Sequence, residues 1–412
     1  MIAVKWQQMI AGLLCMGAIS SPQYVWTLFT PVLKVDFSAS AAALQVTFSL
    51  LIVLQTLFSP IQGWIAKHIH PRSLIMAGIV LTGASWIATA QVHSLTMLYL
   101  TYGGLGGIGT GIVYVGVVSL LMQWFPKNRG MAAGAAAAGY GMGAMVTTFP
   151  ISHLLAASGW RTTMLVFGFV MMAAGVLAAF FLKTPQATQS AQEPSSIGFT
   201  TSYVVKTPLF WLMFFMMATM ATSGLMVTSQ LAQIASDFGV AHLSILGMAA
   251  LPLAMTLDRI ANGVTRPLFG WVSDRMGREQ TMAFAFTLEA IALTCWLALA
   301  NHPVAFVLLS GVVFLGWGEI FSLFPATLTD TFGTRDASRN YGLLYMAQGV
   351  GAIFGGPLAA WLHQTSGNWH LVFGLAIGGD LLTALLAFAV LRPMRRRFMQ
   401  SNGHAYARPF SA

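Results

Sequence analysis

The sequence predicts an all-α membrane protein with twelve transmembrane helices, built as two parallel repeats of six helices. Three observations lead to this fold class: a very apolar composition, a regular series of long apolar segments, and a constant offset that relates the two halves. Of the 412 residues, 57% are hydrophobic and only 8% are charged. Soluble domains carry about 25% charged residues, so this composition excludes an ordinary soluble enzyme or binding domain.

The apolar segments define the order of the predicted helices. A segment of about 20 apolar residues is long enough to cross the hydrocarbon core of a bilayer as a helix. Six such segments lie in the first half, at residues 6–33, 41–66, 72–92, 96–123, 131–155 and 161–183. Six more lie in the second half, at residues 207–235, 246–273, 280–300, 303–329, 340–364 and 369–391.

A polar stretch rich in Gln, Ser, Thr and Pro separates the two sets. The predicted domains are an N-terminal six-helix bundle (1–183), a cytoplasmic linker (184–206), a C-terminal six-helix bundle (207–391) and a basic cytoplasmic tail (392–412). We expect a monomer embedded in the lipid bilayer.

The positive charges predict the orientation of these helices. With both termini inside, sixteen Lys and Arg residues fall on the inner side, and only Lys34 and Arg161 fall in outer loops. Because basic residues concentrate on the cytoplasmic side, we expect both termini in the cytoplasm and the chain in the cell (inner) membrane. The tail cluster Arg395–Arg397 then lies near anionic lipid headgroups. The net charge of +9 could suggest a nucleic-acid partner. However, the basic cluster is not combined with aromatic residues or with a folded nucleic-acid-binding motif, so we expect no nucleic-acid partner.

The two halves are related by an offset of about 207 residues. Pro60-Ile-Gln-Gly-Trp64 matches Pro267-Leu-Phe-Gly-Trp271, and the same offset places Gly104 and Gly111 on Gly311 and Gly318. Parallel repeats with a binding site between them, near the middle of the bilayer, are one plan of secondary transporters.

The eighth apolar segment carries an arginine, Arg266, where a membrane core is expected. A guanidinium at that depth costs roughly 2.5–3.5 kcal/mol on insertion scales, so it needs a partner or a wet cavity. Asn262 lies one helical turn earlier on the same side. The planar donor fork of arginine fits a carboxylate, and our hypothesis is that Arg266 binds a small organic anion. The alternative is a structural ion pair with an acid such as Glu319.

The loop after this segment reads Gly270-Trp-Val-Ser-Asp-Arg-Met-Gly-Arg278. It resembles the loop signature of the major facilitator superfamily, Gly-x-x-x-Asp-Arg-x-Gly-Arg. The resemblance implies that Gly270 lets helices approach closely, and that Asp274 with Arg275 or Arg278 latches the cytoplasmic side of one conformer. Gly277 belongs to the same signature and is predicted to take part in this conformational change. In the first half Lys67 stands where the acid is expected, so a symmetric latch is not predicted there.

An ordered set of segments resembles the oxalate/formate antiporter family within that superfamily. The set comprises Gln23-Tyr-Val-Trp-Thr-Leu28, Gly111-Ile-Val-Tyr114, Trp124-Phe-Pro-Lys-Asn-Arg-Gly130, Gly139-Tyr-Gly-Met-Gly143, Arg266-Pro-Leu-Phe-Gly270, Trp317-Gly318 and Arg339-Asn-Tyr-Gly342. The resemblance implies a carboxylate held by Arg266, with aromatic and amide walls from Gln23, Tyr24, Tyr114, Tyr140 and Trp317. The alternative for each aromatic residue is lipid contact or core packing.

One position departs from the family pattern. Where the oxalate exchanger has a second cation, a lysine, the alignment on Tyr341-Gly-Leu-Leu-Tyr-Met-Ala-Gln348 places Gln348. A buried dianion needs two positive partners, so a monocarboxylate such as formate, lactate or pyruvate suits Arg266 and Gln348 better than oxalate. Arg266-Pro267 also resembles proton-linked monocarboxylate transporters, but those carry an acid where Asn262 stands here.

The coupling ion is a second open question. Asp258, Glu289, Glu319 and Asp380 are the acids in the apolar segments. Glu319 follows Trp317 by two residues and points roughly to the opposite side, and the resemblance places Glu289 and Asp380 in peripheral helices, so no acid is a convincing proton carrier. This favours exchange of one anion for another. The alternatives are proton-coupled monocarboxylate symport, and a membrane sensor that binds the carboxylate without moving it.

Other patterns predict packing and not chemistry. Gly104-Leu-Gly-Gly-Ile-Gly109 fits a dinucleotide-binding pattern, but it lies inside an apolar segment with no preceding strand, so we interpret it as a helix-packing surface. Gly130/Gly134 and Gly351/Gly355 have the same interpretation. The histidines have no metal-ligand spacing, and no nucleophile–base set or phosphate loop is present. We therefore expect no cofactor, no metal and no enzymatic activity.

Overall fold

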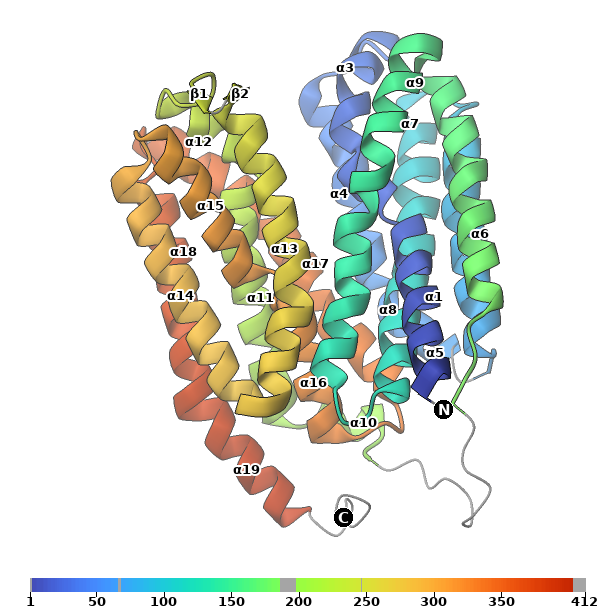
Figure 1. Cartoon of the computed structure of the whole chain (residues 1–412), viewed down its shortest axis with the longest axis vertical. Helices are drawn as coiled ribbons and strands as arrows, with labels where there is room; N and C mark the ends of the chain where they lie inside the picture. The colour runs from blue at the N-terminus through green and yellow to red at the C-terminus, as the bar shows by residue number, and fades with distance from the viewer. Residues whose placement is uncertain (1, 66–67, 186–197, 246, 403–412) are drawn as a thin grey trace. The chain divides into compact units, whose positions relative to one another are not determined.

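The computed structural model describes residues 2–65, 68–185, 198–245 and 247–402 (Figure 1). By its internal contacts the chain divides into two compact units. Unit 1 comprises Met1–Pro126 and Ala135–Pro185, and unit 2 comprises Lys127–Gly134 and Gln186–Ala412. Lys67, most of the predicted linker and the last part of the predicted tail lie outside the described residues, and the predicted domain boundaries stay predictions.

Unit 1 contains the helices of the first predicted set. They are α1 (Ile2–Ala18), α2 (Ser21–Tyr24), α3 (Trp26–Asp36), α4 (Ala41–Leu57), α5 (Ser59–Ile65), α6 (Pro71–Thr89), α7 (Leu95–Leu98), the π-helix η1 (Tyr99–Leu105), α8 (Gly106–Trp124) and α9 (Arg129–Phe180), whose first residues belong to unit 2. Helix α9 covers the fifth and sixth predicted segments and is interrupted at Gly159, which has φ 77° and ψ 170°. Glycine adopts this backbone conformation without steric cost, so the interruption falls there.

Unit 2 contains the second set. Its elements are α10 (Thr201–Val204), α11 (Pro208–Thr228), α12 (Leu231–Asp237), β1 (Ser244–Ile245), β2 (Met248–Ala249), α13 (Ala250–Met276), α14 (Arg278–Leu299), α15 (Pro303–Trp317), α16 (Ile320–Phe332), α17 (Ala337–Ser366), α18 (His370–Leu386), the π-helix η2 (Ala387–Leu391) and α19 (Arg392–Ser401). Strands β1 and β2 form a small antiparallel hairpin before α13.

Three helices begin at a proline. Pro71, Pro208 and Pro303 begin α6, α11 and α15, because a helix does not need an N–H group in its first turn. Among the described residues, eight helical stretches are long and apolar enough to cross a membrane. Several predicted spans are made of two helical pieces, which shortens the individual helices.

Close helix contacts occur at the predicted glycines. A Cβ atom added to Gly107 would lie 2.5 Å from the carbonyl oxygen of Leu51 in α4. One added to Gly351 would lie 2.5 Å from Cβ of Ala221 in α11, and one added to Gly355 would lie 2.8 Å from Cβ of Leu225. The interpretation of these glycine patterns as packing surfaces is confirmed.

Candidate functional site

Arg266 lies in the middle of α13 and is only 2% exposed. Its Nη2 atom donates a hydrogen bond of 2.6 Å to Oδ1 of Asn262, one turn earlier, which confirms the predicted proximity of the two side chains. The guanidinium carbon lies 4.6 Å from the ring centre of Phe321 in α16. An aromatic face attracts a cation and holds the flat guanidinium group in one orientation. Phe321 was not predicted, because its place beside Arg266 depends on the packing of α16 against α13.

Glu319, the acid proposed as an alternative partner of Arg266, lies between α15 and α16 and is fully buried. It is near enough for the charge of Arg266 to act on it. In the described part of the chain, however, neither of its carboxyl oxygens meets hydrogen-bond geometry with any group. A buried structural ion pair would show such bonds. A hydrogen-bonded ion pair of Arg266 with Glu319, the predicted alternative, is therefore not seen among the described residues, and the anion-binding role of Arg266 stays a prediction.

Trp317 contacts this region from α15, and the predicted residue Gln348 lies in α17 of the same unit. Trp317, at the end of α15, is 8% exposed, and its ring contacts that of Phe321 edge-on at 5.9 Å between centroids. Its Nε1–H donates a hydrogen bond to the carbonyl oxygen of Met220 in α11 (3.1 Å), so this N–H joins two helices of unit 2. Gln348 is buried in α17, and its side-chain oxygen has no hydrogen-bond partner among the described residues.

The predicted side chains of unit 1 form one cluster around Tyr140 of α9. The Tyr140 hydroxyl donates to Oε1 of Gln23 (2.6 Å) and lies 3.4 Å from Oε1 of Gln55 in α4. The Tyr140 ring contacts Tyr24 (5.4 Å between centroids) and Tyr114 (5.3 Å). The structure therefore brings together the four residues that the resemblance selected in this unit. Gln55 was not predicted.

Gln23 lies where the first span is broken into α1, α2 and α3. The seventh span is broken in the same way between α11 and α12, and Gln230 occupies that break. The two glutamines are separated by the repeat offset of 207 residues. Broken helices expose backbone polar groups and often mark binding regions in transporters. The offset could have identified Gln230, although no motif pointed to it.

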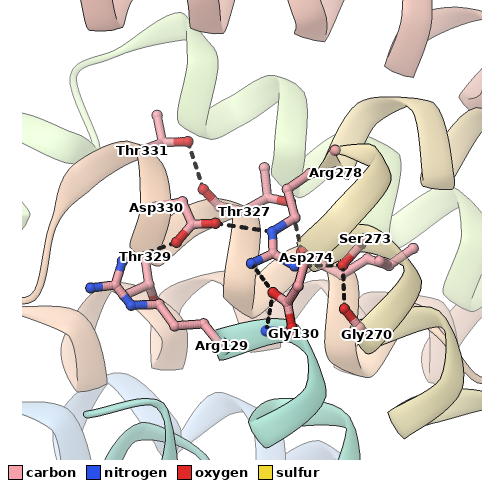
Figure 2. Close-up of polar contacts among 12 residues, drawn as sticks. Arg129, Gly130, Gly270, Ser273, Asp274, Arg278, Thr327, Thr329, Asp330 and Thr331 are labelled. Atoms are coloured by element: carbon pink, nitrogen blue, oxygen red, sulfur yellow. Dashed lines mark hydrogen bonds and ion pairs between the residues drawn. The ribbon is translucent and has the colours of Figure 1, made fainter. Parts of the chain in front are cut away.

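The predicted latch residue Asp274 lies near the end of α13 (Figure 2). Its carboxylate accepts hydrogen bonds from the backbone N–H groups of Gly130 (3.1 Å) and Met131 (3.0 Å) in the first turn of α9. The N-terminal amides of a helix lack partners within the helix and carry partial positive charge, so a carboxylate binds well there. Residues Lys127–Gly134, which include the first turn of α9, belong to unit 2 by their contacts.

Two arginines and a second acid complete this cluster (Figure 2). Arg278 forms an ion pair with Asp274 (2.6 Å), and its Nε donates to Oδ2 of Asp330 (2.9 Å). The other oxygen of Asp330 accepts from Nη1 of Arg129 (2.9 Å). Asp330 therefore joins α9 and α14 through α16. Neither Asp330 nor Arg129 was predicted to have a role here.

The remaining residues of the predicted latch, Gly270, Arg275 and Gly277, have separate positions. Gly277 has φ 97°, a conformation that favours glycine, and it separates α13 from α14. Gly270 packs directly against the backbone of Gly130. Arg275 lies over the ring of Trp271 at 3.9 Å from its centre. Of the two arginines proposed for Asp274, the structure thus pairs Arg278.

The acids considered for coupling are buried in unit 2. Glu289 in α14, Glu319 and Asp380 in α18 are each 0% exposed, and Glu289 is near enough to the other two for their charges to interact. Neither carboxyl oxygen of Glu289 has a hydrogen-bond partner in the described chain. No group of three or more His, Cys, Asp or Glu residues with metal-binding geometry occurs among the residues that the structure describes.

Comparison with known proteins identifies the family of this chain. The family model of the Major Facilitator Superfamily matches residues 9–257 and 231–408. The chain belongs to the Major Facilitator Superfamily. The protein is thus a membrane-embedded transporter with twelve spans in two repeats, and the fold class predicted from the sequence is confirmed.

Individual relatives agree with this assignment. The chain is 31% identical over 389 residues to the oxalate:formate antiporter of Oxalobacter formigenes, covering 94% of this chain and 90% of the relative, so the recognition of that family is also confirmed. It is 24% identical over 343 residues to monocarboxylate transporter 13 of Bos taurus, covering 82% and 78% of the two chains. The crystal structure of the transporter FucP in the outward conformation has the same fold, with a TM-score of 0.68, 14% identity, and coverage of 92% of this chain and 98% of that one.

Proposed function

We propose that this transporter exchanges small carboxylates by alternating access, and that a monocarboxylate such as formate, lactate or pyruvate is preferred. The observation that carries the proposal is the buried guanidinium of Arg266 in the middle of α13, oriented by Asn262 and Phe321. The relatives named for oxalate:formate and monocarboxylate transport support this substrate class. We also propose that both termini lie in the cytoplasm and that the chain lies in the inner membrane, because its basic residues are concentrated in the loops expected on the cytoplasmic side.

Arg266 binds the carboxylate through parallel N–H···O bonds, the strongest geometry available to this pair. The aromatic ring of Phe321 and the buried surroundings reduce competition from water, which strengthens the attraction. A dianion would need a second cation beside Arg266, and Gln348 supplies a neutral amide at that position. A substrate with one negative charge therefore suits this pair better than a substrate with two. Gln23, Tyr24, Tyr114 and Tyr140 are assigned to the same substrate by the family resemblance.

The proposed exchange follows from the cost of keeping a positive charge in the membrane. A bound carboxylate lowers the cost of keeping Arg266 away from water, so the loaded carrier changes conformation more readily than the empty one. The cluster of Asp274, Arg278, Asp330 and Arg129 holds one conformer until substrate binding offsets its energy.

The decisive experiment is uptake of labelled formate, lactate and oxalate into proteoliposomes. Arg266→Gln removes the charge and should reduce uptake at least about 30-fold, because a buried charged hydrogen-bonded pair contributes about 2–5 kcal/mol to binding. Arg266→Lys keeps the charge but loses the planar fork, and should retain a small part of the activity. Arg259→Gln, two turns earlier in α13, is the matched control and should keep monocarboxylate uptake within a few-fold.

The outcome that contradicts the proposal is normal uptake and normal KM in a well-folded Arg266→Gln variant. Folding is checked by a monodisperse elution profile and an unchanged melting temperature. Uptake of oxalate in preference to all monocarboxylates would contradict only the substrate preference.

Proton-coupled symport is the second candidate, because unit 2 contains the buried carboxyl groups of Glu289 and Glu319 without hydrogen-bond partners among the described residues. Ionisable groups inside membrane proteins commonly mark proton relays. If anions are exchanged, internal counter-anion should stimulate uptake, and Glu289→Gln should leave this stimulation within about twofold of the wild type. Uptake driven by an imposed pH gradient, and lost in Glu289→Gln, would replace exchange with symport.

A further inference from the structure

Unit 2 contains a cavity of about 200 Å³ between the α13–α14 turn and α19. Three guanidinium groups line it, those of Arg392, Arg395 and Arg396, together with the side chains of Glu279 and Gln280. Three positive charges thus face one negative charge. None of these groups belongs to the Arg266 region or to the Asp274 latch, so the function proposed above leaves this cavity unexplained.

Helix α19 is held in place by contacts that do not involve all of its arginines. Phe398 packs against Phe332 (5.2 Å between ring centroids) and Phe199 (5.3 Å). Arg395 donates from Nε to Oγ1 of Thr331 (2.7 Å) and from Nη1 to Oε1 of Glu279 (2.8 Å). Glu279, the one acid among the described residues that line the cavity, is therefore already paired with Arg395.

Arg392 and Arg396 are then the cations available to a ligand. No ion pair joins either of them to an acid within the described ranges of the chain. Arg392 lies 5.1 Å from the ring centre of Phe388, and with its amide oxygen turned toward Arg392 the Gln280 side chain accepts a bond of 3.1 Å from that guanidinium. Two guanidinium groups lining one cavity, with that of Arg392 held by Phe388 and Gln280, favour a phosphate group, because their donor forks match its oxygens.

The position of α19 indicates where that phosphate comes from. The apolar stretch of α18 and η2 ends at Leu391, and the basic helix begins at the next residue. Because arginines concentrated at the end of a span cannot lie in the hydrocarbon core, this helix marks the headgroup layer. Two exposed apolar side chains, Met276 (58% exposed) and Met399 (38%), also line the cavity and suit the glycerol and acyl part of a lipid.

We propose that this cavity binds the phosphate headgroup of an anionic phospholipid, with Arg392 and Arg396 as its ligands. The site adjoins the latch along the chain. Glu279 follows Arg278, and Thr331 follows Asp330, so the Arg395 contacts and the Arg278–Asp330 ion pair are carried by the same two helix ends. A lipid phosphate that draws Arg395 toward itself therefore changes the surroundings of the latch.

The test is direct binding to the purified full-length protein, which needs no transport activity. Short-chain dioctanoyl phosphatidylglycerol is titrated in detergent and followed by the melting temperature, with dioctanoyl phosphatidylcholine as the zwitterionic control. Each arginine near a phosphate contributes about fivefold to affinity, so Arg392→Gln with Arg396→Gln should weaken binding about 30-fold. Arg397→Gln lies on the same helix but does not line the cavity, and should leave binding within about fivefold.

Further measurements distinguish a specific lipid site from a free-phosphate site and from general surface charge. Inorganic phosphate alone should stabilise the protein far less than the lipid, and equal stabilisation would make this a free-phosphate site and overturn the lipid assignment. Equal weakening by Arg397→Gln and by the double substitution would reduce the effect to general surface charge. Equal binding of both lipids by the wild type would also overturn the proposal.

Discussion

The carboxylate of Asp330 offers the sharpest test of the latch, because it joins two arginines from different helices. Its two oxygens accept hydrogen bonds of 2.9 Å from Arg129 and from Arg278. Asp330→Asn removes the negative charge but keeps the size of the side chain and one acceptor oxygen. Both arginines then lose a charged partner while they remain largely buried, with side chains 14% and 8% exposed.

The expected cost follows from these contacts. A hydrogen bond to a charged group contributes about 1.5–3 kcal/mol, and the side chain of Asp330 is 24% exposed, which reduces the value through solvent screening. Since asparagine keeps one of the two bonds in weaker form, we expect a loss of about 2–3 kcal/mol. This energy corresponds to a change of about 30- to 150-fold in the population of the latched conformer.

The assay is the melting temperature of the purified protein in detergent, with Asp36→Asn as the matched control. Asp36 forms an exposed ion pair with Arg161 at 3.3 Å, with side chains 42% and 37% exposed. Exposed pairs contribute about 0–1 kcal/mol, so this substitution should change the melting temperature little. A double-mutant cycle of Asp330→Asn with Arg278→Gln isolates the pair, and we expect a coupling free energy above about 1 kcal/mol.

The reasoning is refuted if Asp330→Asn lowers the melting temperature no more than Asp36→Asn, or if the cycle shows a coupling near zero. Either result would mean that water replaces the carboxylate without cost, and that the cluster is an ordinary solvated surface.

Two further predictions concern packing and the cluster of unit 1. Gly130→Ala should lower the melting temperature by several degrees, because its Cβ would lie 2.5 Å from the carbonyl oxygen of Gly270, whereas Gly104→Ala, with its nearest such contact at 3.7 Å, should not. Equal melting temperatures for the two variants would contradict this packing. Tyr140→Phe removes the hydrogen bond to Gln23 and should raise the KM for the carboxylate about fivefold, the equivalent of about 1 kcal/mol. Tyr99→Phe loses a hydrogen bond to the backbone of Ala43 instead, so it should leave KM unchanged, and a matching rise in its KM would remove Tyr140 from the substrate site.

Side-chain contacts within one helical turn could be predicted from the sequence, because residues three and four apart lie on the same face of a helix. The hydrogen bond between Arg266 and Asn262 and the ion pair between Arg278 and Asp274 both have this spacing. The long apolar segments likewise indicate helices whatever their neighbours are.

The breaks within the spans are a different case. Gln23 lies in the short helix α2 between α1 and α3, and Gln230 lies between α11 and α12. Periodicity alone joins each of these series into one helix, since the pieces are apolar. The repeat offset links the two positions, but only the folded chain shows that each lies at an interruption.

The sequence by itself therefore determined the membrane class, the repeat, the intramembrane arginine and the acid of the latch. Only the tertiary structure decided that Asp330 joins Arg129 to Arg278, that Phe321 covers Arg266, and that Glu319 leaves its carboxyl oxygens without a hydrogen bond in the described chain. Arg129 and Asp330 are 201 residues apart. Contacts across such separations depend on which helices pack together and in which rotation, and an apolar helix that is buried on several sides carries no periodic signal for either.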